Sequence, residues 1–404
     1  MRKIKQALKI LMDNGLINGA KIIIKILKRS EIHELVQVKH DVFSFYNYIL
    51  FDKNEAQLKK IEGNVKLLWF IPDFGIGSGG HLNIFRMIFN LEKLGMKSDI
   101  VICGYSQWVN EFIAKQTIDN NFFQLSSRIY FVNNESDIKK LDKYHVGMAT
   151  SWQTAYYVNN FSNCINKFYF VQDFEPFFYP RGSSFVFAEN TYKFGFSGIS
   201  AGSWISTKLT TEYGMECTPF SFSYDKELYL KHKKRDDKKR VFFYARPPTD
   251  RRGFELGLFA LNELYKKDAK VEFVLAGWDT SEYKIPFPHL NAGVLSISEL
   301  SDLYSQCNVA LVLSFTNLSL LPLEILASGC EVLLNDGDNN TWLDPHKKLF
   351  NYVSGNVTDI VNGLLDILDG TIEKDQNYIN NFLENSSWGK EASIVYNKLL
   401  EKVD

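Results

Sequence analysis

Three arginines follow one apolar run of this sequence and could neutralise a phosphate. Arg246 directly follows residues 241–245, and Arg251 and Arg252 come just before a helix that we expect to begin near Phe254. Guanidinium groups bind phosphate oxygens strongly and stabilise the charge that develops on a leaving phosphate. Arginines are common on protein surfaces, but a position at the end of a strand favours a functional role. We select Arg246 and Arg252 for that role.

The stretch from residue 308 to 340 predicts a β-α-β unit. The apolar run 309–313 is typical of a buried strand, and residues 332–334 are typical of a second one. Between them, Pro322 marks the start of a short helix and Gly329 marks its end. The free N–H groups at such a helix start lie at the C-terminal edge of the sheet, where phosphates bind. We expect this role for Ser319, Leu320 and Leu321.

Glu324 falls in the first turn of that helix and has two interpretations. Its carboxylate either complements the helix dipole or accepts a hydrogen bond from a ligand hydroxyl. The stretch resembles the nucleotide-sugar site of family 4 glycosyltransferases, which have the α/β GT-B fold of two Rossmann-like domains facing across a cleft. Their motif is a glutamate, a glycine-rich loop and a second glutamate, and here Thr316 takes the first place and Glu324 the second. The resemblance implies that Thr316, Asn317 and Glu324 contact the sugar donor.

Polar residues also end an apolar strand in the first half of the chain. The run 168–171 continues into Q-D-F-E-P-F-F-Y-P-R-G-S, which places Gln172, Asp173 and Glu175 just past the strand. One interpretation is core packing followed by a proline turn. We favour a sugar-binding surface of aromatic faces and carboxylates, because polar groups at this edge of a sheet often bind ligands. Asp173 would then orient an acceptor hydroxyl.

This segment carries a more specific resemblance. Residues 172–183 and 318–329 look like the corresponding stretches of bacterial rhamnosyltransferases of the WsaF type, within family 4, and the similarity extends over nearly the whole chain. It implies retaining transfer of L-rhamnose from dTDP-β-L-rhamnose to a growing, lipid-linked cell-surface polysaccharide, without a metal or other cofactor. In family 4 an arginine and a lysine serve the diphosphate. Arg246 matches the arginine, and Arg251 or Arg252 stands for the lysine.

A glycine-rich loop follows the first predicted strand and offers a different ligand. Gly75, Gly77 and Gly80 match the G-x-G-x-x-G pattern of dinucleotide sites. That pattern expects an acidic residue at the end of the next strand, where it would hold the ribose. Here the strand 100–103 runs into glycine, and Asp99 precedes it. We therefore rank NAD binding well below a nucleotide-sugar site.

The resemblance to GT-B enzymes gives the glycine loop another place, facing the cleft between the domains. It implies that Gly79, Gly80 and His81 lie near the acceptor or the donor diphosphate. A histidine at a helix start more often has no chemical role. We nevertheless count His81, with Asp173 and Arg246, among the catalytic candidates.

Two further loops follow strands of the second half. Gly277 allows a close approach after the strand 271–276, and Trp278 either lines the base pocket or packs in the core. The D-x-D pattern of Asp336 and Asp338 binds a cation in another glycosyltransferase fold. A three-residue pattern is a weak signal, so we interpret it as a polar turn.

The length of 404 residues predicts more than one domain. Strands alternate with helices in both halves, as in doubly wound sheets. We expect a basic helical extension at 1–62, a Rossmann-like acceptor domain at 63–225 and a Rossmann-like donor domain at 226–386. The resemblance implies that residues 387–404 form a helix that crosses back to the first domain.

Composition narrows the partners. The net charge of −1 gives no drive toward nucleic acid, and the five cysteines form no C-x-x-C pair. Scattered cysteines in apolar runs favour reduced thiols and a cytoplasmic location. Residues 1–30 alternate basic and apolar side chains, so this segment either packs on the body or lies on an anionic membrane surface, peripheral to the inner face of the plasma membrane.

Three rival functions remain open. A non-catalytic nucleotide-sugar-binding subunit is compatible with Thr316 in the place of a glutamate. An NAD-dependent oxidoreductase would use the loop 75–80. A sugar-nucleotide epimerase shares the GT-B fold, but it should carry more acids and histidines in its cleft.

Overall fold

The computed structural model of the chain describes residues 41–51 and 58–403, and it divides the chain into two compact units, 1–52 and 53–404. The described part of the first unit contains α3 (Val42–Phe45) and the short 3-10 helix η1 (Asn47–Leu50). The basic segment 1–30 lies outside the described residues, so its predicted membrane contact stays a prediction.

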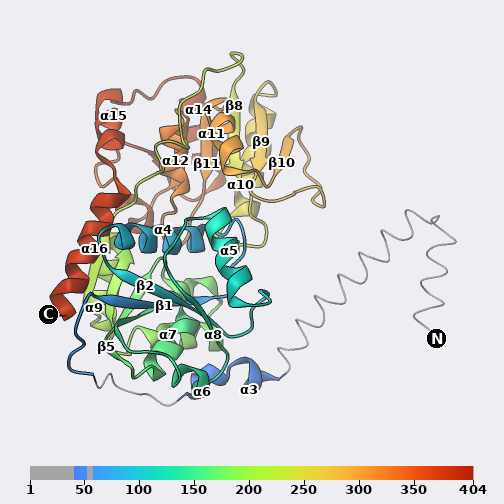
Figure 1. Cartoon of the computed structure of the whole chain (residues 1–404). Helices are drawn as coiled ribbons and strands as arrows, with labels where there is room; N and C mark the ends of the chain where they lie inside the picture. The colour runs from blue at the N-terminus through green and yellow to red at the C-terminus, as the bar shows by residue number, and fades with distance from the viewer. Residues whose placement is uncertain (1–40, 52–57, 404) are drawn as a thin grey trace, which may run out of the picture. The chain divides into compact units, whose positions relative to one another are not determined.

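The first sheet of this unit has seven parallel strands in the order β3-β2-β1-β4-β5-β6-β7 (Figure 1). The strands are β1 (Lys66–Pro72), β2 (Lys97–Cys103), β3 (Ile129–Val132), β4 (Tyr144–Ala149), β5 (Cys164–Val171), β6 (Ser197–Ala201) and β7 (Cys217–Phe220). The helices between them are α4 (Gly79–Lys93), α5 (Glu111–Asn121), α6 (Glu135–Ile138), α7 (Trp152–Asn160), η2 (Glu175–Phe178), α8 (Ser183–Thr191) and α9 (Ser203–Tyr213).

The second sheet has six parallel strands in the order β10-β9-β8-β11-β12-β13. The strands are β8 (Arg240–Tyr244), β9 (Glu272–Ala276), β10 (Leu290–Gly293), β11 (Val309–Val312), β12 (Glu331–Asn335) and β13 (Asn351–Val353). Its helices are η3 (Asp250–Arg252), α10 (Phe254–Lys267), α11 (Ile297–Ser305), α12 (Leu321–Ala327), α13 (Asp338–Thr341), α14 (Val357–Leu368) and α15 (Gln376–Asn385).

Both sheets are buried on their two faces, which explains their unbroken apolar strands. In β1, the five residues from Leu67 to Ile71 are all buried, and every residue of β11 is buried. Helices cover the faces of parallel sheets because each strand is joined to the next by a crossover. Because the strands of each sheet are parallel, their C-terminal ends lie at one edge of the sheet. The polar loops after these ends form the candidate site.

The last helix, α16 (Trp388–Val403), packs on the first sheet's domain, against α4 and β7. Figure 1 shows it running along that domain after the chain has completed the second sheet. Trp388 begins this helix, and the guanidinium of Arg86 in α4 lies 4.7 Å from its ring centroid. The C-terminal segment thus returns to the first domain of the unit.

Strand positions agree with the sequence predictions in most of the chain and differ in detail. The predicted strand at 100–103 is the C-terminal part of the observed β2, which begins at Lys97 and so contains Asp99. Asp99 accepts hydrogen bonds from the Arg128 side chain and from the Tyr144 hydroxyl. It lies in the first half of β2, away from the edge where a ribose would bind. The strands β7, β10 and β13 were not predicted.

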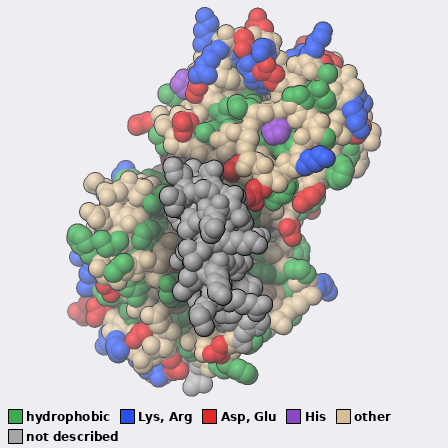
Figure 2. Space-filling view, turned by 90° about the vertical axis from the view of Figure 1, so that its right-hand side faces the viewer, with side chains coloured by type: hydrophobic (Ala, Val, Ile, Leu, Met, Phe, Trp, Pro, Cys, Tyr) green, Lys and Arg blue, Asp and Glu red, His purple; other side chains and the backbone are tan. Residues whose placement is uncertain are grey.

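The described surface carries both signs of charge. On the face drawn in Figure 2, Lys and Arg side chains lie among Asp and Glu side chains, in keeping with the net charge of −1. Within residues 41–51 and 58–403, no helix has both the length and the apolar character that a membrane crossing requires.

Candidate functional site

The loops after β5 and β11 meet at the C-terminal edges of the two sheets. The Thr316 hydroxyl donates to Asp173 Oδ2 at 2.7 Å, and the Asn317 N–H donates to Asp173 Oδ1 at 2.9 Å. Thr316 and Asn317 are each 1% exposed. The predicted acceptor-side carboxylate and two predicted donor-side residues are therefore in direct contact.

Asn317 connects the two domains through its side chain as well. Its Nδ2 donates to the carbonyls of Gln172 and Ala201, at 3.0 and 2.8 Å. Its Oδ1 accepts from the indole N–H of Trp342 at 2.9 Å. Each polar atom of this side chain makes a hydrogen bond with protein, so Asn317 holds loops of the two domains together.

Arginines of the second domain lie beside Asp173. Arg251 Nε is 3.8 Å from Asp173 Oδ2, and its guanidinium lies 4.0 Å from the ring centroid of Phe178. Arg252 donates to the Ser314 hydroxyl at 2.9 Å. Burial lowers the pKa of Arg252, and the charge of Asp173 opposes this shift. Burial also raises the pKa of Asp173, against the Thr316 hydrogen bond and the two arginines.

Arg246 belongs to the same cationic cluster, because its positive charge interacts with that of Arg252. Its NH1 donates to the Gly277 carbonyl at 3.1 Å, and its guanidinium lies 5.7 Å from the ring centroid of Trp278. Gly277 has a φ of +107°, and a Cβ there would come within 2.7 Å of the Tyr244 ring. Gly277 thus lets the strand end turn sharply, which brings Trp278 and Arg246 together as one surface.

The loop from Ser314 to Leu318 is held by three asparagines that sequence reasoning did not select. The Ser314 carbonyl accepts from the side-chain amides of Asn335, Asn339 and Asn340, at 2.8, 3.1 and 3.0 Å. The network restrains the loop although Asn340 Oδ1 is buried without a hydrogen-bond partner in the described chain. A loop bonded at so many points is preorganised before any ligand arrives.

This rigid loop leads into α12, where the predicted phosphate contacts lie. The hydrogen bonds of the helix begin at Leu323 and Glu324, whose N–H groups donate to the Leu320 carbonyl. Among the residues that the structure describes, the N–H groups of Ser319, Leu320 and Leu321 have no acceptor. The helix has only seven residues, so the arginines supply most of the positive charge at this edge.

Glu324 lies in a buried polar cluster formed by both domains. Burial raises its pKa to about 7, although the charge of Arg86 and a hydrogen bond with Tyr229 lower it. Arg86 is 2% exposed and bonds Asp225 at 2.6 Å. A carboxylate with this pKa changes its charge near neutral pH, which suits it to a ligand-dependent hydrogen bond.

The glycine loop lies at the start of α4, which begins at Gly79. Both ring nitrogens of His81 have protein partners, the Ser78 hydroxyl at 2.8 Å and the Pro72 carbonyl at 3.3 Å. Burial lowers the pKa of His81. Gln172 Nε2 donates to the Gly80 carbonyl at 3.2 Å, so this loop touches the segment that carries Asp173. With these contacts, His81 stabilises the start of α4.

Glu175 lies deeper than the other predicted acceptor-side residues and is 7% exposed. It accepts from the Trp152 N–H at 2.9 Å and from the Tyr169 hydroxyl at 2.6 Å. Burial raises its pKa to about 7. Both carboxyl oxygens are bonded inside the first domain, so Glu175 supports the loop from beneath.

Several contacts at this edge were not predicted from the sequence. Trp342 packs between the domains against Phe222, with ring centroids 5.0 Å apart. Arg251, passed over in favour of Arg252, is the arginine that approaches Asp173. Asp336 of the D-x-D pattern pairs with Lys347 at 2.7 Å, as a polar turn would. No sequence spacing could have identified the contacts of Trp342 with Phe222 and of Arg251 with Asp173, because each joins distant segments.

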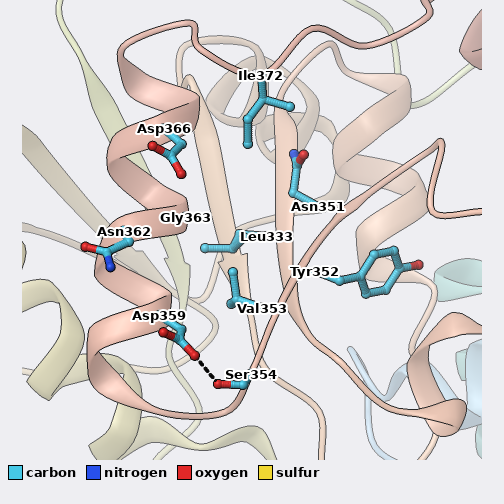
Figure 3. Close-up of a pocket in the computed structure, with 10 residues that line it drawn as sticks. All are labelled: Leu333, Asn351, Tyr352, Val353, Ser354, Asp359, Asn362, Gly363, Asp366 and Ile372. Carbon is cyan, nitrogen blue, oxygen red and sulfur yellow. Dashed lines mark hydrogen bonds between the residues drawn. The ribbon is translucent and has the colours of Figure 1, made fainter.

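A separate hollow of about 400 Å³ lies beside β13 (Figure 3). Asp359, Asn362 and Asp366 project from α14 along its rim, and the Ser354 hydroxyl donates to Asp359. None of the residues that line the hollow is a predicted site residue. We therefore place the candidate site at the meeting loops and not here.

The sequence of this chain is similar to those of known proteins. Residues 239–365 match the family described as the WsaF C-terminal domain. The O-antigen biosynthesis protein RfbC of Myxococcus xanthus is 34% identical over 290 residues, which are 69% of this chain and 22% of that protein. The chain thus matches less than a quarter of the length of this relative. The resemblance to WsaF-type proteins is confirmed for residues 239–365.

Solved structures of low sequence identity share the fold. TarM is 11% identical with a TM-score of 0.62, over 84% of this chain and 99% of that one. Anabaena HepE, solved with UDP-glucose, is 12% identical with a TM-score of 0.58, over 84% and 97%. A glycosyltransferase from Rickettsia africae is 13% identical with a TM-score of 0.57, over 84% and 100%. At these identities the likeness concerns the fold, and the predicted GT-B fold is confirmed.

Proposed function

Because residues 239–365 belong to the WsaF C-terminal domain family and the chain has the GT-B fold, we propose that this protein is a glycosyltransferase of cell-surface polysaccharide synthesis. It takes a nucleotide sugar as donor and a growing, lipid-linked glycan as acceptor. The donor is dTDP-β-L-rhamnose, and transfer retains the anomeric configuration without a metal ion.

The observation that carries this proposal is the cluster of Arg246, Arg251 and Arg252 at the edge of the second sheet. The charges of Arg251 and Arg252 act on Asp173, and the charge of Arg246 acts on Arg252, so three guanidinium groups form one cluster that contains this carboxylate. Three cations around one anion leave excess positive charge, which a diphosphate would neutralise. The neighbouring N–H groups of residues 319–321 add donors for the same oxygens.

The chemistry of this chain then divides between its two domains. Arg246 and Arg252 bind the diphosphate and stabilise its charge as the sugar departs. Glu324 accepts a hydrogen bond from a hydroxyl of the donor. Asp173, on the other domain, orients the acceptor hydroxyl. In this scheme the leaving phosphate takes the acceptor proton, so no protein nucleophile is needed.

A ligand panel tests the proposal directly. Thermal unfolding is measured with dTDP, UDP, GDP, ADP, NAD and dTDP-rhamnose, each with and without EDTA, on the wild type and on Arg246→Ala. A ligand at about 100 times its Kd stabilises by roughly 2.7 kcal/mol, which raises Tm by several degrees. We expect a rise with the dTDP compounds that survives EDTA and shrinks in Arg246→Ala.

Turnover separates the remaining alternatives. Incubation with dTDP-β-L-rhamnose and a rhamnose-terminated acceptor should release dTDP and form a β-linked product, which NMR of the anomeric position identifies. Binding of dTDP-rhamnose without turnover on any acceptor would favour a non-catalytic subunit. A Tm rise with NAD alone would favour the oxidoreductase, and a rise that EDTA abolishes would contradict metal independence.

A further inference from the structure

Asp173 is surrounded more completely by the second domain than by its own. Its Oδ1 accepts from the N–H groups of Phe174 at 2.8 Å and Asn317 at 2.9 Å. Its Oδ2 accepts from the Thr316 hydroxyl at 2.7 Å. A carboxylate offers about four acceptor positions. The structure fills three of them, and the open one is on Oδ2.

An unpaired donor lies beside that open position. Arg251 Nε is 3.8 Å from Asp173 Oδ2, too far for a hydrogen bond. The same nitrogen is buried and has no hydrogen-bond partner in the described chain. Buried polar atoms are nearly always bonded, so an open acceptor facing an unpaired donor marks a place for one polar ligand atom.

We propose that Thr316 and Asn317 are positioning residues for Asp173 and not contacts of the donor. They hold the carboxylate so that the open acceptor position of Oδ2, beside Arg251 Nε, receives the acceptor hydroxyl. Asp173 leaves β5 of the first sheet, and its two partners follow β11 of the second. The acceptor-orienting carboxylate is therefore complete only when the two domains are together. This inference rests on the proposed glycosyl transfer.

The surroundings of Asp173 define what else could influence it. Arg251 and Arg252 face it from the second domain, and the charges of Glu175 and Tyr192 interact with it from the first. None of these four groups depends on the Thr316 hydroxyl for its own hydrogen bonds. A substitution that removes this hydroxyl alone thus isolates the contact to be tested.

The test compares two variants of Thr316. Thr316→Val removes the hydroxyl and nearly keeps the shape of the side chain, and Thr316→Ser keeps the hydroxyl. The control is Thr191→Val, another buried threonine, whose hydroxyl donates to the Ala188 carbonyl at 2.6 Å. We expect Thr316→Val to lower kcat by about ten-fold or more, because a hydrogen bond to a charged group is lost. Donor Kd should change by less than two-fold, and Thr316→Ser should restore kcat.

A double-mutant cycle shows whether Thr316 acts through Asp173. In an Asp173→Asn background, Thr316→Val should cause no further loss of kcat, because the carboxylate it positions is gone. A donor contact would behave differently. If Thr316→Val raises donor Kd five-fold or more, or lowers kcat equally in both backgrounds, the proposal is overturned.

A measurement that needs no turnover separates this inference from the proposed function. Carbon NMR of protein labelled at the aspartate carboxyl, with Asp173→Asn to identify the signal, reports the Asp173 pKa. Loss of the Thr316 hydroxyl should raise that pKa, while Thr191→Val should leave it unchanged. An unshifted pKa in Thr316→Val overturns the positioning role. If the wild type transfers no sugar but Thr316→Val still raises the Asp173 pKa, the proposed glycosyl transfer is contradicted, whereas the contact between Thr316 and Asp173 is supported.

Discussion

The indole of Trp342 lies so close to Gly202 that a Cβ at residue 202 would stand 2.5 Å from Cε2 of the ring. Gly202 follows β6 of the first sheet and has a φ of +96°. Trp342 follows α13 of the second domain and donates its N–H to Asn317. The contact is backbone against ring, with no room for a side chain. Glycine is required here for both its φ and its size.

Replacing Gly202 should therefore loosen the contact between the domains. Gly202→Ala forces either the backbone or the indole to move, and overpacking of this kind costs about 1–3 kcal/mol. Urea unfolding measures the loss, and small-angle scattering should show a larger radius of gyration. Gly214→Ala is the matched control, because Gly214 has a φ of +67° but nothing within 4 Å of its Cβ position. Equal behaviour of the two variants would mean that Trp342 does not constrain Gly202.

Loss of Arg246 should reduce catalysis more than stability. Its guanidinium lies near the Trp278 ring and, within the described residues, donates a hydrogen bond only to the Gly277 carbonyl, so Arg246→Ala removes little structure. If it stabilises the leaving diphosphate, kcat/KM should fall by about 100-fold or more. Steady-state release of dTDP measures this, with Tm as the check on folding.

A paired arginine serves as the control for that experiment. Arg240 bonds Asp236 and Glu272, both at 2.8 Å, in the part of β8 farthest from the site edge. Arg240→Ala should lower Tm and leave kcat/KM within about two-fold, since Arg240 lies at the opposite end of β8 from the site and its two carboxylate partners are exposed. Unchanged turnover in Arg246→Ala would remove Arg246 from the mechanism.

Sequence alone predicted the fold well because the signal is local. The buried strands read as apolar runs, and their polar ends selected Asp173, Arg246 and the loop of Thr316. Short edge strands such as β13, of three residues, carry too little pattern to be found. The predicted start of β2 also differs from the observed one. β2 begins at Lys97 because its first residues pair with β1, and no local pattern reveals this pairing.

Partners within the site were less predictable than its members. Thr316 and Asn317 were assigned to the donor because of the resemblance to the family 4 motif, but in the structure both donate hydrogen bonds to Asp173. Glu175 follows a strand like its neighbour Asp173, yet it turns inward to Trp152 and Tyr169. A strand end limits where a side chain can lie. Contacts across two domains decide which group it meets.

Glu324 should make donor binding depend on pH. Burial raises its pKa to about 7, so the proton is bound below that pH and lost above it. A carboxylate accepts a hydroxyl hydrogen bond more strongly than the protonated form does. Donor Kd should therefore fall as pH rises from 6 to 8, by up to about ten-fold for one pKa unit of linkage.

Calorimetric titration of the wild type and Glu324→Gln measures this effect. The variant cannot titrate, so the difference between the two proteins excludes the ionisation of the nucleotide itself. Glu175→Gln is the control, because Glu175 also has a pKa raised to about 7 by burial but is bonded inside the first domain. Parallel pH profiles for wild type and Glu324→Gln would show that Glu324 does not contact the donor.

Arg86 should contribute more to the free energy of unfolding than an arginine in an exposed ion pair does. It is 2% exposed, bonds Asp225 at 2.6 Å and contacts the ring of Trp388, where α16 begins. Removing Arg86 leaves Asp225 without its partner, and because the Asp225 side chain is 28% exposed, the cost is about 2 kcal/mol and not the larger cost of a fully buried pair. Arg86→Met should lower the free energy of unfolding by that amount in urea.

The matched control is an arginine–aspartate pair at the surface. Arg128 bonds Asp99 at 2.8 Å, but the arginine side chain is 59% exposed, so Arg128→Met should cost about 1 kcal/mol or less. Adding Asp225→Asn to Arg86→Met should recover part of the loss, because the unpaired carboxylate is then neutral. Equal costs for the two arginines would contradict a structural role for Arg86.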